Sequence, residues 1–350
     1  HVKELIMQRI EAALARKQPN VDVRLAALAL LRAIHKKDFT LVNLLWKRCK
    51  STFDVQPYNE ITRDDLQLGE EIGSGSFGKV YKGFWQPKRH QAKGHRRQTA
   101  LQVAVKIIPE NSQLFDLDDL RGEFIALSVL DHRNIISMHG AGCITSDVGL
   151  GGIHATHWFI VMDLMKHSLE DLIHDSGRKG LVLREILDIA AQICHGLIYL
   201  HRHSIIHRDI KPGNILLNEK GVVKVSDLGI AKPTTGTFLH TAIGTQNYMP
   251  PETCDLTATS KVDFGPEVDC YSFGVLLLEM ITGASPDRHM LKKYQRTKLV
   301  TQLGEQVPAS VQKIIRKCLQ SNPKRRPTSA QVGEVIEAAL EKLCISSRLS

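Results

Sequence analysis

The chain has 350 residues, 43% of them hydrophobic, which is enough for two or three domains with substantial cores. Its formal net charge is +9, but because no basic face is interleaved with aromatic residues, we predict no nucleic acid binding. The seven cysteines are scattered without a CxxC pair and no apolar run could span a membrane, so we expect a cytoplasmic protein with no disulfide framework, zinc site or membrane span.

Residues 1–60 are predicted to form a helical segment that ends in a polar linker. The apolar residues of "VKELIMQRIEAALAR" (2–16) recur every four residues, as on one face of a helix. Two further amphipathic patterns cover residues 22–35 and 39–48. This part loosely resembles an ankyrin-type helix pair, although an unspecified helical cap or linker is the favoured interpretation. We expect signalling partners, if the protein has them, to bind through these helices.

Strand patterns follow the linker, and helical patterns follow the strands. The stretches "LQLGEEIG", "KVYKGFW", "LQVAVKII" and "HWFIVMDL" are rich in β-branched and aromatic residues. After residue 180, long amphipathic patterns such as "LREILDIAAQICHGLIYLH" indicate helices. The expected architecture is therefore α+β, with a small β-rich part before a larger helical part.

The stretch "GSGSFGKV" (73–80) fits the pattern G-x-G-x-x-G-x-V, in which glycines allow the backbone to approach phosphates closely. The same glycine spacing opens a helix in dinucleotide-binding folds. Here "KVYKGFW" follows, and this stretch is strand-like. A β-hairpin that covers phosphates is therefore favoured over a dinucleotide-binding fold.

The next strand carries "VAVK" (103–106), in which Ala104 and Lys106 point to the same face. The small side chain leaves room for a flat base, while the ammonium group can reach phosphate oxygens. A half-buried lysine needs an acidic partner. Glu123, beside the apolar stripe of an expected helix, is the candidate partner.

The stretch "IIHRDIKPGNILL" (205–217), followed by "VKVSDLG" (223–229), is the most specific signal. With the glycine loop and "VAVK" before it, this ordered set of motifs resembles a eukaryotic-type protein kinase domain. The sequences of the motifs are similar to those of the tyrosine-kinase-like branch of serine/threonine kinases. The resemblance implies a bilobal fold over residues 61–343, with an N-lobe of about 64–165 and a C-lobe of about 166–343. The helical segment would precede it.

The resemblance also implies roles for individual residues. Asp209 would orient the substrate hydroxyl and accept its proton, Lys211 would neutralise charge near the transferred phosphate, and Lys106, fixed by Glu123, would hold the α- and β-phosphates. Asn214 and Asp227 would hold Mg²⁺, with Mn²⁺ as an alternative. The residues expected to bind ATP are Gly73, Ser74, Gly75, Ser76, Phe77, Gly78, Val80, Ala104, Lys106, Met162, Asp163, Met165, Ser168 and Leu216.

Two motifs depart from the family pattern. "DLG" replaces the commoner DFG, and we expect Leu228 to keep the packing role of the phenylalanine. "PPE" (250–252) replaces APE, and we expect Glu252 still to pair with Arg326. Asp269 resembles the helix residue that braces the catalytic loop.

These features predict a protein kinase that phosphorylates serine and threonine, because Lys211 and "GTQNYMPPE" follow the serine/threonine pattern. Phosphorylation within the segment between Asp227 and Glu252 is expected to regulate activity through Arg208. The candidate acceptors are Thr234, Thr235, Thr237 and Thr241, and Thr245 is expected to be structural. The alternatives are an ATP-binding pseudokinase scaffold, disfavoured by the complete residue set, and a small-molecule kinase, disfavoured by the peptide-docking pattern.

Overall fold

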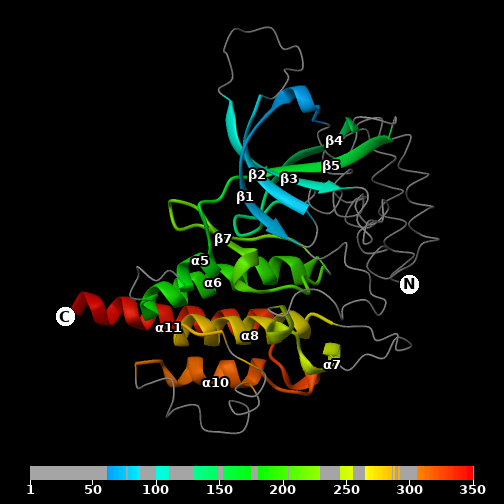
Figure 1. Ribbon diagram of the computed structural model, residues 1–350. Coiled ribbons are helices and arrows are strands. Elements are labelled where there is room, and N and C mark those ends of the chain that lie inside the picture. Colours follow the sequence, from blue (N-terminus) through cyan, green and yellow to red (C-terminus); the bar gives the residue numbers. More distant parts are fainter. Residues whose placement is uncertain are drawn as a thin grey trace, which may run out of the picture. The chain divides into compact units, whose positions relative to one another are not determined.

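The structure is a computed structural model that describes residues 61–75, 78–86, 100–109, 130–148, 153–174, 180–203, 205–228, 245–254, 265–285, 287, 291 and 306–349. These residues form two units. The first comprises the described residues up to Asp131 together with Ile136–Leu164, and the second comprises His132–Ile135 and the described residues from Met165 onward. The first unit is rich in strands and the second in helices, which confirms the expected β-rich and helical parts (Figure 1). The helices expected within residues 1–60 lie outside the described residues.

The first unit is built on one antiparallel sheet. Its elements are η1 (Arg63–Asp65), β1 (Leu66–Gly75), β2 (Gly78–Trp85), β3 (Leu101–Pro109), β4 (Met138–Val148) and β5 (Ile153–Asp163). The five strands follow the order β1-β2-β3-β5-β4. The four strand patterns found in the sequence all fall within this sheet, so those predictions are confirmed.

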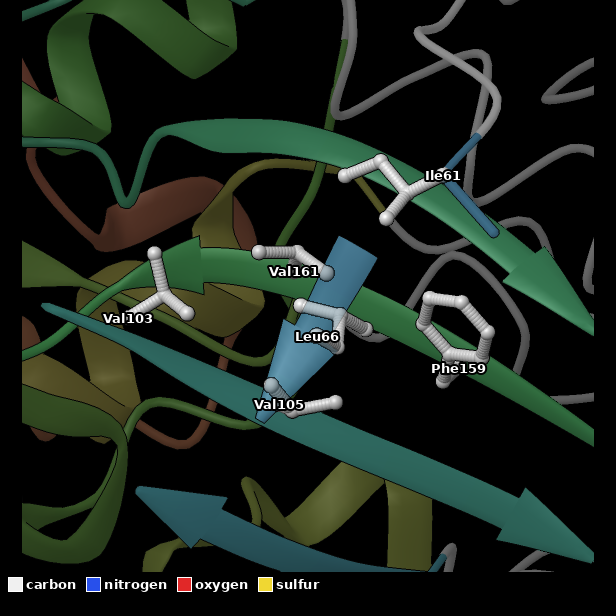
Figure 2. Close-up of a cluster of buried hydrophobic side chains, with 6 residues drawn as sticks. All are labelled: Ile61, Leu66, Val103, Val105, Phe159 and Val161. Atoms are coloured by element: carbon white, nitrogen blue, oxygen red, sulfur yellow. The ribbon is translucent and has the colours of Figure 1, made fainter. Parts of the chain in front are cut away.

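One face of this sheet carries the core of the first unit, and Figure 2 shows its buried side chains gathered in one cluster. The cluster consists of Ile61, Leu66, Val103, Val105, Phe159 and Val161. Val103 and Val105 of β3 are fully buried here, so the alternating residues of the strand belong to the opposite face. That opposite face carries Ala104 and Lys106, which are the residues of functional interest.

The second unit combines helices with a short three-stranded sheet, in the order β6-β7-β8. Its elements are β6 (His167–Ser168), α5 (Leu169–His174), α6 (Leu183–Arg202), η2 (Pro212–Asn214), β7 (Ile215–Leu217), β8 (Val223–Val225), η5 (Thr245–Tyr248), α7 (Pro251–Cys254), α8 (Glu267–Thr282), α10 (Ala309–Cys318), η7 (Pro323–Arg325) and α11 (Ser329–Leu349). Among the residues that the structure describes, no helix is both long and apolar enough to cross a bilayer.

Helix α8 is the buried centre of the second unit. Every residue from Val268 to Met280 is buried, and the helix packs against α6, α10 and η5. A helix buried all round is typical of a core element rather than a surface helix. It ends at Gly283, which adopts a left-handed conformation with φ 69° and donates its N–H to the Glu279 carbonyl at 2.8 Å. Polar side chains on α8 therefore face neighbouring elements, and two of them reach the loops described below.

Candidate active site

The glycine-rich stretch is the turn of a β-hairpin, as predicted. Gly73 pairs with Val80 and Gly75 with Gly78 in the antiparallel register of β1 and β2. Gly78 has φ +136°, and a Cβ there would lie 2.0 Å from the carbonyl oxygen of Ile107. Glycine is required at this position, because any side chain would meet the β3 backbone. Ser76 and Phe77, between Gly75 and Gly78 in the sequence, lie outside the described residues.

Strand β3 places its small residue and its lysine on a common face with residues from both neighbouring strands. Val80 of β2 lies opposite Lys106, and Met162 of β5 lies opposite Ala104. Directly paired residues project from the same face of a sheet, so these four expected ATP-binding residues are neighbours. Ala104 is buried and Lys106 is half-buried. Glu123, the expected partner of Lys106, lies outside the described residues.

The end of β5 and the residues that follow it make contacts within their own units. In the first unit, Asp163 donates its N–H to the Ser137 carbonyl at 3.1 Å, and its Oδ1 lies 3.0 Å from Nε2 of His139. In the second unit, Ser168 of β6 pairs with Leu216 of β7. Met165 belongs to the same unit and precedes β6.

Ser168 has a structural role that the sequence analysis did not predict. Its backbone N–H donates to Oδ2 of Asp171 at 2.8 Å, and its Oγ accepts the Asp171 N–H at 3.1 Å. This reciprocal pair caps the start of α5. The expectation that Ser168 approaches the ribose stays a prediction.

Two of the predicted site residues, Lys211 and Asn214, contact Asp209. Asn214 donates Nδ2 to the Asp209 backbone carbonyl at 2.7 Å and to Oδ2 at 2.9 Å. Nζ of Lys211 lies 3.1 Å from the same Oδ2, and only 4% of the Asp209 side chain is exposed. The carboxylate is therefore held by a charged donor and an amide, which fixes its direction. Because both bonds of Asn214 use its nitrogen, its Oδ1 is the atom suited to a hard cation.

The segment that contains Asp227 is tied to the same loop. The N–H and Oγ of Ser226 both donate to the Asn214 carbonyl, at 2.9 and 3.0 Å. Asp227 then takes the left-handed conformation with φ 58°, which is uncommon for residues other than glycine. Leu228 is 1% exposed, as its expected packing role requires. The two expected metal ligands therefore sit on backbone segments that are directly hydrogen-bonded to each other.

The loop that contains His207, Arg208 and Asp209, called the catalytic loop, is hydrogen-bonded to α8. Asp269 accepts the backbone N–H of His207 through Oδ2 at 2.8 Å and that of Arg208 through Oδ1 at 2.7 Å. Arg208 has φ 67°, so the residue before Asp209 is kept in an uncommon conformation. Asp269 is fully buried, and it also lies 2.8 Å from Nε2 of His201. The expectation that Asp269 braces the loop is confirmed, whereas the His201 contact was not predicted.

The expected pairing of Glu252 with Arg326 is confirmed. Nη1 and Nη2 of Arg326 donate to Oε1 and Oε2 of Glu252 at 2.6 and 2.7 Å. The guanidinium carbon also lies 4.9 Å from the centre of the Tyr271 ring. This bidentate pair fixes α7, and with it the end of the segment that begins at Asp227.

A second buried carboxylate on α8 was missed by the sequence analysis. Glu279, 1% exposed, accepts the Tyr248 hydroxyl at 2.5 Å, and its other oxygen lies 3.1 Å from Nε2 of His174. Burial, together with the bond and charge of Glu279, raises the pKa of Tyr248, so the phenol stays a donor. The contact holds η5, just before "PPE", against α8. One signal was present in the sequence, since Glu279 is an isolated acid in the apolar stretch "VLLLEMI".

Five threonines named in the sequence analysis have side chains outside the described residues. Thr245 begins η5, but its side chain lies outside the described residues. The four candidate phosphorylation sites, Thr234, Thr235, Thr237 and Thr241, lie entirely outside the described residues.

Comparisons with known proteins agree on one family. A family model described as "Protein kinase domain" matches residues 66–335. The chain is 32% identical over 295 residues to a Dictyostelium discoideum protein named "Probable serine/threonine-protein kinase", a match that covers 82% of this chain and 16% of that protein. It is 27% identical over 294 residues to serine/threonine-protein kinase STY17 of Arabidopsis thaliana, covering 81% and 46%.

A match of similar extent involves a protein with a different name. The chain is 29% identical over 276 residues to protein-tyrosine kinase 6 of Homo sapiens, covering 77% of this chain and 55% of that protein. The chain thus spans between 16% and 55% of the length of these three relatives.

Proposed function

Because the chain belongs to the protein kinase family, we propose that it is an active serine/threonine kinase that transfers the γ-phosphate of ATP to protein substrates. The observation that carries the proposal is the arrangement around Asp209. Lys211 and Asn214 both contact its Oδ2, at 3.1 and 2.9 Å, in a buried environment. A general base for phosphoryl transfer needs such a fixed direction, since catalysis rests mainly on positioning and charge stabilisation.

In this proposal, Asp209 aligns the acceptor hydroxyl and receives its proton, and Lys211 neutralises charge on the transferred group. Asn214 and Asp227 hold Mg²⁺, which supplies charge neutralisation for the phosphates when bound. Their donor set of an amide oxygen and a carboxylate suits a hard cation, and Mn²⁺ fits it as an alternative. In the first unit, Lys106 holds the phosphates, while Val80, Ala104 and Met162 line the adenine site.

Serine and threonine are proposed as acceptors because of Lys211. This lysine follows Asp209 by two residues, as in the serine/threonine pattern, and its contact with Asp209 supports a role beside the acceptor hydroxyl. Two of the relatives above carry serine/threonine kinase names, and one carries a tyrosine kinase name. The acceptor residue is therefore part of the proposal rather than of the family assignment.

Regulation completes the proposal. Phosphate on one or more threonines between Asp227 and Glu252 would bind the guanidinium of Arg208 and order that segment. A cytoplasmic location and signalling partners for residues 1–60 belong to the same proposal, on the basis of the scattered cysteines and the amphipathic helical patterns.

The test is phosphate transfer from labelled ATP to a generic protein substrate, followed by phosphoamino-acid analysis. We expect phosphoserine and phosphothreonine from the wild-type protein, and a loss of several orders of magnitude for Asp209→Asn, because the amide cannot accept the proton. ATP binding by that variant should be unchanged. Equal rates for both proteins would favour the pseudokinase scaffold and assign any transfer to a contaminant, and mainly phosphotyrosine would overturn the acceptor assignment.

A further inference from the structure

Three side chains from different strands meet at one end of the sheet in the first unit. Nε2 of His139 in β4 lies 3.0 Å from Oδ1 of Asp163, the last residue of β5. The His139 ring also lies against Trp85, the last residue of β2, with the ring centroids 5.7 Å apart. The side chains of His139 and Asp163 are only 28% and 26% exposed, so water weakens their contact less than that of a fully exposed pair.

A β-bulge in β4 brings His139 to this position. Met138 pairs with Met162 and Gly140 pairs with Val161, so His139 is one extra residue between two successive pairs. The bulged strand β4 lies at the edge of the five-stranded sheet. A bulge redirects a side chain at the expense of regular strand pairing. The irregularity therefore occurs at the residue whose ring contacts Asp163.

The sheet separates the Asp163 carboxylate from the proposed adenine site. Asp163 pairs with Val103, whose side chain belongs to the buried core. Met162 pairs with Ala104 on the other face. Because successive strand residues point to opposite faces, the carboxylate lies on the core side and Met162 on the adenine side. The Asp163 N–H is bound to the Ser137 carbonyl at 3.1 Å, so both the side chain and the backbone of Asp163 are tied to the start of β4.

We propose that His139 is a positioning residue for ATP binding, which acts by holding the end of β5 through Asp163. Its ring is in turn held by Trp85, which packs against the core of the first unit. A backbone that is fixed before the ligand arrives loses less conformational entropy on binding, so the pair should raise nucleotide affinity. The inference rests on the proposed kinase function, because the adenine site that it concerns is part of that proposal.

Two substitutions at residue 139 separate hydrogen bonding from packing. His139→Gln places an amide nitrogen near the position of Nε2, so a donor to Asp163 is kept. His139→Leu fills a similar volume but has no donor. The matched control is His195→Leu in the second unit. His195 also contacts a carboxylate, with Nε2 2.6 Å from Oε1 of Glu337, and it is not among the residues proposed for ATP.

The probe is ADP, whose dissociation constant is measured by calorimetry without any phosphate transfer. We expect His139→Leu to raise the Kd of ADP by about fivefold, and His139→Gln and His195→Leu to change it by less than about twofold. The KM for ATP should rise by a similar factor in His139→Leu while kcat stays within about twofold of the wild-type value, because a contact that serves binding alone leaves the chemical step unchanged. Thermal unfolding of each variant shows whether weaker binding merely follows a loss of folded protein.

A double-mutant cycle tests whether His139 acts through Asp163. Asp163→Leu should also raise the Kd of ADP by about fivefold, and its combination with His139→Leu should raise it little further, because both substitutions remove the same contact. An unchanged Kd in either single variant, an equal loss for Leu and Gln at residue 139, or a loss of about 25-fold in the double variant would overturn the inference. If the wild-type protein binds ADP but transfers no phosphate, the proposed catalysis fails and the Kd values still decide this inference. A wild-type protein that does not bind ADP would overturn both.

Discussion

At the scale of single residues, the buried charges of the second unit are matched by specific partners. Arg326 shows this most completely, since its side chain is fully buried. It makes two bonds to Glu252, a third from Nε to the Gln320 carbonyl at 2.8 Å, and a contact with the Tyr271 ring. This set depends on the planar guanidinium fork and not only on positive charge.

Arg326→Lys should therefore destabilise the protein although it keeps the charge. A lysine can make one bond to Glu252 and leaves the other acceptors without a donor, so we expect the free energy of unfolding to fall by about 2 kcal/mol. Urea unfolding measures the change. The matched control is Arg325→Lys, the same substitution at an exposed neighbour, which should change stability by less than about 0.5 kcal/mol. Equal losses at the two positions would show that the bidentate geometry is unimportant.

At the scale of elements, the segment before β1 packs into the core of the first unit and is hydrogen-bonded to β4. Ile61 is 2% exposed and donates its N–H to the Ala141 carbonyl at 2.8 Å, so the chain enters the core one turn before β1 (Figure 2). Its carbonyl lies directly over Gly142 of β4, where a Cβ would meet the oxygen at 2.0 Å and the Phe159 ring at 2.6 Å. Strand β4 therefore requires glycine at position 142.

Gly142→Ala should destabilise the first unit, because the clash involves the Ile61 backbone, which cannot rotate away as a side chain can. We expect a loss of about 2 kcal/mol or more in the free energy of unfolding, at the upper part of the range for overpacked cores. Chemical unfolding followed by circular dichroism measures it. Gly73→Ala is the control, since nothing lies within 4 Å of a Cβ at that position. A Gly142→Ala protein as stable as the control would mean that Ile61 does not pack as described.

At the scale of the whole molecule, the residues proposed for one reaction are divided between two units. Those proposed for the phosphates and adenine lie mostly on one face of the sheet, and those for the acceptor hydroxyl and the cation lie on loops held by α8. The chain between Asp227 and Glu252 begins at the proposed cation ligands and ends at the Arg326 pair. Both ends are anchored, and the action of a charge added between them on the site belongs to the proposed regulation.

Replacing the four threonines of that stretch, Thr234, Thr235, Thr237 and Thr241, by alanine should lower kcat strongly and leave ATP binding intact. The physical reason is the loss of a phosphate that pairs with Arg208. Mass spectrometry of active protein should find phosphate on at least one of the four. Full activity of the fourfold variant would exclude this form of regulation.

The sequence by itself determined the features whose chemistry depends on local spacing. Alternation along "VAVK" predicted which residues share a face of β3, and the β2 and β5 registers confirm it. The roles of Asp209, Lys211 and Asn214 were expected through resemblance to a family rather than through spacing, and the contacts of Lys211 and Asn214 with Asp209 agree with that expectation. The pairing of Glu252 with Arg326 was predicted through the same resemblance.

Only the tertiary structure decided the contacts between residues far apart in the chain. Ser329 and His201 are 128 positions apart, and His201 and Asp269 are 68 apart, so their meeting depends on how α6, α8 and α11 pack. The same holds for Ile61 over Gly142 and for Glu279 beneath Tyr248. Local patterns state what a residue can do, whereas long-range packing selects its partner, because each buried polar group must find a donor or acceptor among the few elements that surround it.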